Sequence, residues 1–266
     1  MIDGGMLVKQ DLSAYGLSIV QRMLLDRMND TGYLAAHGRA LAQDDFAFDS
    51  CDHSALVGGD APRLADYGVV VWAAGEQSVS PAALAPAERA LLTRFRDGGG
   101  RLILSGSEAL YALVEKGDAA SKDFVAGLGV SYLKDSANSL VAQPAAGGIF
   151  DGMPPVRFDD SQGGYLVDYP DVLAAAAGGQ VALRYQGMLA AGQDGAAVVN
   201  DPKRPTVAVF GFPLESVYDE AVRAELLRRL LAAMDVGADP KPADVPDGGA
   251  GDAPDLGTGD DPYKDA

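Results

Sequence analysis

The sequence predicts an α/β fold with a mainly parallel sheet and an antiparallel extension. Short apolar runs alternate with helical stretches along most of its 266 residues, which is typical of strand–helix–strand units. The runs Tyr67–Ala74 and Arg101–Ser105 are continuously apolar, as strands buried on both faces are. The stretch between them has helical spacing and a suitable length for a right-handed crossover.

Two helices and a short strand are predicted before this unit. The first helix is indicated by apolar residues at helical spacing, namely Leu12, Tyr15, Ile19, Met23 and Leu24. The second is indicated in the same way by Tyr33, Leu34, Ala36 and Leu41. The segment Phe46–Phe48 then predicts a short strand.

The crossover helix and the elements after it follow from the same patterns. Pro86 opens a helix whose apolar face is Ala87, Leu91, Leu92 and Phe95, and Asp97–Gly100 closes it. A Gly-rich region then holds the strand-like fragments of the antiparallel extension, Val130–Leu133, Val156–Phe158, Gln180–Tyr185 and Ala196–Val199. Thr206–Phe210 predicts a third buried strand, and Val217–Met234 a final amphipathic helix.

Composition divides the chain into two parts. Residues 1–237 have the apolar content of a globular domain, whereas residues 238–266 are acidic and rich in Pro and Gly. A segment with so few apolar side chains cannot offset its ordering entropy, so a disordered tail or linker is expected. A linker at this position also indicates that further domains of a longer parent chain follow. Its aspartates lack the spacing of a calcium loop.

The charge balance excludes several classes of partner. With 21 basic and 38 acidic residues the formal charge is −17, which argues against nucleic-acid binding.

No apolar run approaches the roughly 18 residues of a membrane span. The first residues lack the features of a signal peptide, so a cytoplasmic location is expected if the chain is complete.

The chain is poor in metal ligands and in imidazole bases. Its single cysteine, Cys51, excludes an internal disulfide, and His37 and His53 are its only histidines. A structural cysteine followed by a solvated histidine is the simplest interpretation of Cys51–His53. We therefore expect no metal site and no cofactor.

Five segments together resemble a known family. They are Val71–Ser78, Gly98–Glu108, Gly148–Gly152, Val167–Asp171 and Val209–Glu215. Their order and spacing are similar to the degenerate class I glutamine-amidotransferase-like domain of secreted bacterial xanthan-lyase-type and N-acetylmuramoyl-L-alanine-amidase-type proteins. The resemblance covers residues 46–234 and implies a three-layer flavodoxin-like fold in an extracellular or cell-envelope setting. In that family a first strand leads into an Asp-Gly pair, and here Asp3-Gly4 follows only two residues.

The residues that a working class I amidotransferase needs are replaced. The turn where the cysteine nucleophile would stand is Ser105–Ala109 and holds no cysteine. The late His-Pro-Glu-like motif has Phe212 in place of histidine. Because a phenyl ring cannot accept a proton, the resemblance does not carry the family's acyl-transfer activity to this chain.

Ser107 is the one weak candidate for a catalytic nucleophile. A serine needs an adjacent base, and both histidines lie far upstream in the sequence. The alternative is that Ser107 caps the following helix, with Glu108 in its first turn.

Polar residues follow each predicted parallel strand and form a candidate ligand-binding set. They are Asp3, Glu76, Gln77, Ser105, Ser107, Glu108 and Glu215. Ligands of open α/β sheets bind beyond the carboxyl ends of the strands, so these side chains could line one acidic cleft for a sugar, a cationic group or a divalent ion. Alternatively, each acid caps a helix or is solvated independently.

These observations favour an accessory module over an enzyme. The leading hypothesis is a non-catalytic or catalytically altered amidotransferase-like module of a secreted cell-envelope or polysaccharide-active protein, with a glycan or cell-wall component as its partner. The alternative is a hydrolase of cell-wall glycan or peptide that uses Ser107 or paired carboxylates such as Glu76 and Glu108. A scaffold without a ligand is the third possibility.

Overall fold

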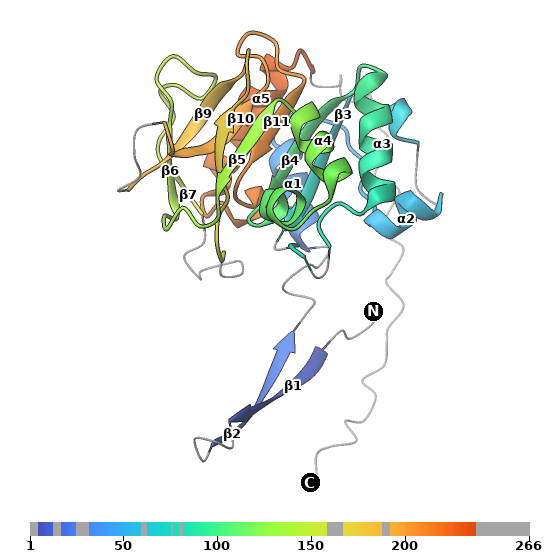
Figure 1. The fold of residues 1–266 in the computed structure, drawn as a ribbon. Coiled ribbons are helices and arrows are strands. Elements are labelled where there is room, and N and C mark those ends of the chain that lie inside the picture. Colours follow the sequence, from blue (N-terminus) through green and yellow to red (C-terminus); the bar gives the residue numbers. More distant parts are fainter. Residues whose placement is uncertain are drawn as a thin grey trace, which may run out of the picture.

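The computed structural model describes residues 5–12, 17–24, 32–59, 63–75, 77–79, 82–158, 167–187 and 192–237. Figure 1 shows that they form a separate hairpin and an α/β body. Asp3, Glu76 and the predicted tail, 238–266, lie outside the described residues.

The first two strands replace a predicted helix. β1 (Gly5–Leu12) and β2 (Leu17–Leu24) pair antiparallel and form a two-stranded sheet of their own. The amphipathic helix predicted over this region is therefore wrong. The helical pattern ran across Gly16, whereas two apolar runs separated by four residues that include a glycine are typical of a hairpin.

Three strands of the body pair in parallel. β3 (Val69–Gly75), β4 (Arg101–Gly106) and β11 (Val207–Phe210) stand in the order β3-β4-β11. α3 (Pro86–Asp97) connects β3 to β4, so the strand–helix–strand unit predicted from the sequence is confirmed. The carboxyl ends of these three strands lie at one edge of the sheet.

The remaining strands are antiparallel. β10 (Gly195–Val199) continues the sheet from β11, and the path then runs through β9 (Gln180–Tyr185), β6 (Val141–Pro144) and β7 (Val156–Arg157). β8 (Val172–Ala175) pairs with β10 and with β5 (Val130–Lys134).

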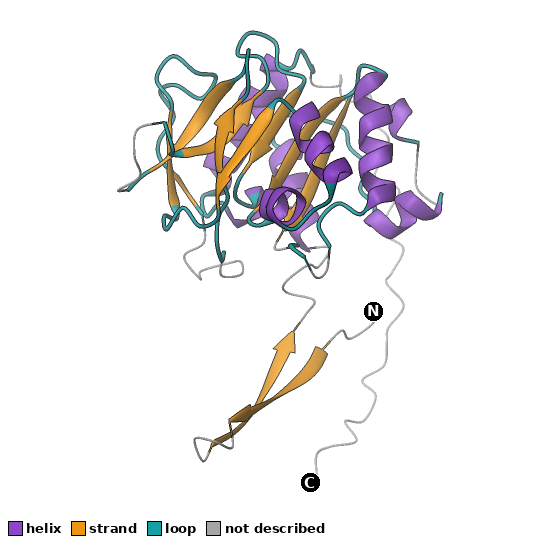
Figure 2. Cartoon of the chain, in the orientation of Figure 1, coloured by secondary structure: helices purple, strands orange, loops and turns teal. Residues whose placement is uncertain are grey.

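The nine-stranded sheet is therefore mixed, and the prediction of a mainly parallel sheet is wrong in its proportions. The α/β class and the antiparallel extension are confirmed. The antiparallel strands curl away from the layered part, as Figure 2 shows, so the sheet is half-barrel-like rather than clearly a flavodoxin-like three-layer sandwich.

Helices cover both faces of the parallel strands. α1 (Gly32–Ala42), which confirms the second predicted helix, packs with α5 (Glu220–Ala233) on one face. α3 packs with α4 (Ala119–Gly127) on the other. The shorter helices are α2 (His53–Gly58), the 3-10 turns η3 (Leu64–Asp66) and η5 (Leu214–Ser216), and the π-helical η4 (Tyr111–Glu115).

The predicted strand Phe46–Phe48 is irregular chain, because it pairs with no strand of the described sheet. Phe48 is 45% exposed, and its ring lies against Gly38 of α1. A Cβ added at Gly38 would lie 2.8 Å from the Cζ atom of Phe48.

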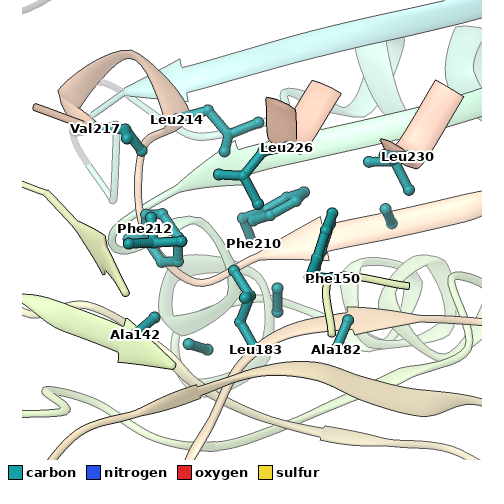
Figure 3. Packing of buried hydrophobic residues seen from close by; sticks show 14 of the residues in the cluster. Ala142, Phe150, Ala182, Leu183, Phe210, Phe212, Leu214, Val217, Leu226 and Leu230 are labelled. Atoms are coloured by element: carbon teal, nitrogen blue, oxygen red, sulfur yellow. The ribbon is translucent and has the colours of Figure 1, made fainter. Parts of the chain in front are cut away.

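Aromatic rings fill the core between α5 and the sheet. Figure 3 shows Phe150, Phe210 and Phe212 with Leu226 and Leu230 of α5 in this layer. All five are at most 1% exposed, so truncating one of the rings would cost about 3–5 kcal/mol. Within the described ranges, no helix is long and apolar enough to cross a membrane.

Candidate functional site

The turn after β4, where the sequence predicted a degenerate nucleophile position, is closely packed. Ser105 and Ser107 are 0% and 1% exposed. The backbone N–H of Ser107 donates to the carbonyl of Gly75 at 3.1 Å and joins the ends of β3 and β4. A Cβ on Gly106 would lie 2.9 Å from the Cβ of Ala74, so the close approach of the two strands requires glycine. The serines at this position are therefore enclosed.

The segment Val167–Asp171 crosses the carboxyl ends of β4 and β11. The backbone N–H of Asp171 donates to the carbonyls of Ser107 at 2.9 Å and Gly211 at 2.8 Å. The Tyr185 hydroxyl lies 3.0 Å from the Asp171 carbonyl oxygen and 3.1 Å from that of Gly211. The chain itself therefore closes this part of the strand-end edge, where an open α/β sheet would bind its ligand.

The Asp171 carboxylate caps the helical segment that follows β4. Its Oδ2 accepts hydrogen bonds from the backbone N–H groups of Leu110 at 2.8 Å and Tyr111 at 3.3 Å. The cap predicted for Ser107 is thus supplied by Asp171, from a segment distant in the sequence. A carboxylate at a helix start is also favoured by the helix dipole.

The electrostatic environment of Asp171 is unusual. Its side chain is 0% exposed, and Oδ1 has no hydrogen-bond partner among the described residues. Burial raises the pKa of this carboxyl well above its ordinary value, while the two backbone N–H groups oppose the shift. Asp135 and Glu108 raise the pKa further. Sequence reasoning included Asp171 in a family-like segment but gave it no role, because its neighbours come from other strands.

Phe212, which the sequence resemblance placed at a histidine position, is a core residue. Its ring is fully buried and stacks on Phe158 with the centroids 4.3 Å apart and the planes inclined by 7°. Tyr185 and Phe210 contact it edge-on. Figure 3 shows Phe212 among apolar side chains of the layer below α5.

Glu215, at the end of the same motif, lies in the helix layer. Its Oε2 is 3.9 Å from Nε2 of His37 on α1, and both side chains are at most 5% exposed. The Arg223 guanidinium donates to the backbone carbonyl of Val217 at 2.7 Å and lies 3.5 Å from that of Glu215. Burial lowers the pKa of Arg223. His37 lies far upstream in the sequence, and in the folded chain it contacts the late motif through Glu215.

The predicted ligand-binding set separates into groups. Gln77 is half-buried, and its backbone N–H donates to the carbonyl of Ala74. Ser105 lies in β4 and Ser107 and Glu108 follow that strand directly, whereas Glu215 lies against His37. Asp3 and Glu76 lie outside the described residues, so a cleft shared by all four carboxylates stays a prediction.

Cys51 and His53 lie in the part of the sequence between α1 and α3, and His53 is the first residue of α2. Nδ1 of His53 is 2.5 Å from Oε1 of the buried Glu88, whose other oxygen accepts the backbone N–H of Ala85. Burial and the neighbouring Asp52 raise the pKa of the exposed Cys51 thiol. A raised pKa reduces the thiolate fraction, so Cys51 is not an activated nucleophile. The described residues contain no group of three or more side chains that could hold a metal ion.

Cavities are found elsewhere, among the described residues of the body. One of about 600 Å³ lies between α1 and the chain around Phe48 and Cys51. A smaller one, of about 210 Å³, lies near Arg96 and Asn200, at the amino ends of the parallel strands.

No protein-family model matches the chain, and no curated protein matches it significantly. Among solved structures, α-L-fucosidase isoenzyme 2 from Paenibacillus thiaminolyticus is similar over 76% of this chain, with 13% identity and a TM-score of 0.46. The match covers only 29% of the fucosidase chain. A protein from Thermoplasma acidophilum assigned as one of the subunits of GMP synthase is similar over 76% of this chain and 88% of its own, with 10% identity and a TM-score of 0.48.

Proposed function

We propose that this chain is an amidotransferase-like module without acyl-transfer activity, which serves as an accessory or ligand-binding part of a secreted cell-envelope or polysaccharide-active protein. The observation that carries the proposal is the closed strand-end edge, where Asp171 bonds to the backbone of both Ser107 and Gly211.

Acyl transfer requires an accessible nucleophile and a base beside it. Ser107 is 1% exposed, and Phe212 is stacked in the core. Both imidazoles contact carboxylates, His37 that of Glu215 and His53 that of Glu88. These contacts support the proposed absence of acyl-transfer activity. They also weigh against the alternative of a hydrolase that uses Ser107.

The setting and the partner class come from the sequence resemblance. The five segments resemble those of a domain found in secreted proteins that act on polysaccharide or cell wall. A glycan is therefore the ligand class that we propose for the module.

A glutamine-hydrolysis assay tests the proposal. The unaltered protein should release no ammonia above buffer, and Phe212→His should not introduce activity because the nucleophile is still absent. Glutamine turnover that Ser107→Ala abolishes would replace the proposal with a serine-dependent enzyme.

A further inference from the structure

β3 is an edge strand of the nine-stranded sheet. Among the described residues its only strand partner is β4, with which it pairs in parallel. The carbonyl of Gly68, just before β3, accepts a hydrogen bond from the backbone N–H of Arg101 in β4. Because successive backbone groups of a strand point to alternate sides, the N–H and C=O groups of Val69, Val71 and Ala73 point away from β4. We call this unpaired side of the strand the β3 flank.

The helices cover β3 less completely than they cover its neighbour β4. In β4, Leu102, Ile103 and Leu104 are each 0% exposed. In β3, the three consecutive valines 69–71 are only half-buried, although they pack against core clusters on both faces of the sheet. Apolar side chains are therefore open to contact along the β3 flank.

The β3 flank lacks the features that keep exposed edge strands apart. Charged residues, prolines and very short strands normally prevent an edge from pairing with another chain. β7, at the other end of the described strand path, is two residues long and includes Arg157, and β5 ends in Lys134. β3 has seven residues, and none of them is charged or is a proline. Of these described edges, β3 is thus the one best suited to pair with a further strand.

We propose that two copies of this chain associate through their β3 strands, which pair antiparallel across a two-fold axis. A two-fold contact uses the same surface on both copies, and an edge strand is complementary to an identical strand that runs in the opposite direction. The outward backbone groups fix the register. Val71 lies opposite its own counterpart, and Val69 lies opposite Ala73 of the second copy. The half-buried valines of the two copies then cover one another.

The net charge of the chain opposes this association and gives it a distinctive salt dependence. Each copy carries a formal charge of −17, so two copies repel each other in low salt. Added salt screens this repulsion, whereas backbone hydrogen bonds and apolar contacts need no opposite charges. Association should therefore tighten as salt is added, which is the reverse of a contact held by ion pairs.

Analytical ultracentrifugation of the full chain measures the association. The chain has a mass of 27.5 kDa, and we expect a dimer of twice that mass with a dissociation constant on the order of 10 µM. Val71→Pro removes an N–H from the β3 flank and should weaken association by about tenfold or more. That N–H does not pair with β4, so the fold should be kept. Val71→Thr keeps both the N–H and the branched side chain, and this matched control should associate like the unaltered protein.

Engineered cysteines test the register without a proline in the strand. In an antiparallel pair, the Cα atoms of opposed hydrogen-bonded residues lie about 5.5 Å apart, a separation that a disulfide can span. Cys51→Ser first removes the exposed native thiol. In that background, Val71→Cys should form a cross-linked dimer under mild oxidation. Val69→Cys lies opposite Ala73 of the second copy, not opposite its own counterpart, and should stay uncross-linked.

Three results would overturn the proposal. The first is a monomer at every protein and salt concentration, and slow amide exchange at Val69 and Val71 in that monomer would mean that another part of the same chain covers the β3 flank. The second is a dimer that Val71→Pro leaves intact. The third is equal cross-linking of Val69→Cys and Val71→Cys. None of these measurements depends on the proposed function, so the two proposals can fail independently.

Discussion

Replacing Asp171 with asparagine should make the stability of the domain less dependent on pH. The asparagine Oδ1 can accept the same backbone N–H groups from Leu110 and Tyr111, so the cap is kept. The substitution removes the ionisable carboxyl group, and burial raises the pKa of that group in the folded protein.

The sign and size of the effect follow from proton linkage. An unfolded aspartate titrates near about 3.9, and because the folded pKa is higher, the folded protein holds the extra proton between the two values. The stabilisation from protonated Asp171 is complete below the unfolded pKa and is lost as the pH rises through the folded pKa. Over a full pH unit in that window the wild type loses about 1.4 kcal/mol, or about 3–5 °C in melting temperature.

Thermal unfolding followed by circular dichroism between pH 4 and pH 8 measures this difference. The melting temperature of Asp171→Asn should rise relative to wild type with increasing pH, by at least about 3 °C over the range. Asp168→Asn, an exposed neighbour in the same segment, is the matched control. A constant offset between Asp171→Asn and wild type at every pH would refute the reasoning.

Two further changes test the packing and the domain boundary. Gly211→Ala would place a Cβ 2.0 Å from the Asp171 carbonyl oxygen, and we expect a loss of about 3 kcal/mol by denaturant unfolding, whereas an unchanged midpoint would contradict the close approach. Truncation after Gly237 should leave the melting temperature unchanged because residues 238–266 offer few apolar side chains, and a loss of several degrees would mean that this segment docks on the body.

The sequence predicted the elements whose patterns are local. The strands β3, β4 and β11 could be predicted because burial on both faces produces a continuous apolar run. The helix α3 could be predicted because burial on one face produces apolar residues at helical spacing. β6 and β8 were missed because neither segment stands out from its surroundings: β6 ends in Gln143 and Pro144, and β8 runs into the alanines of residues 174–177.

The site was harder to predict than the fold. The absence of a histidine at position 212 and of a cysteine around Ser107 can be read from the sequence alone. The closure of the edge by Asp171 cannot, because it depends on hydrogen bonds between residues 64 and 40 positions apart in the sequence, Asp171 with Ser107 and with Gly211. The contact of His37 with Glu215 is equally non-local.

Amide hydrogen exchange at Asp171 tests the central claim, the closed strand-end edge, most directly. This N–H donates to the carbonyls of Ser107 and Gly211 inside the body. It should therefore exchange only through global unfolding, as slowly as the most protected amides of β4. Exchange within seconds at neutral pH, with β4 still protected, would mean that the segment opens in the folded protein and exposes Ser107.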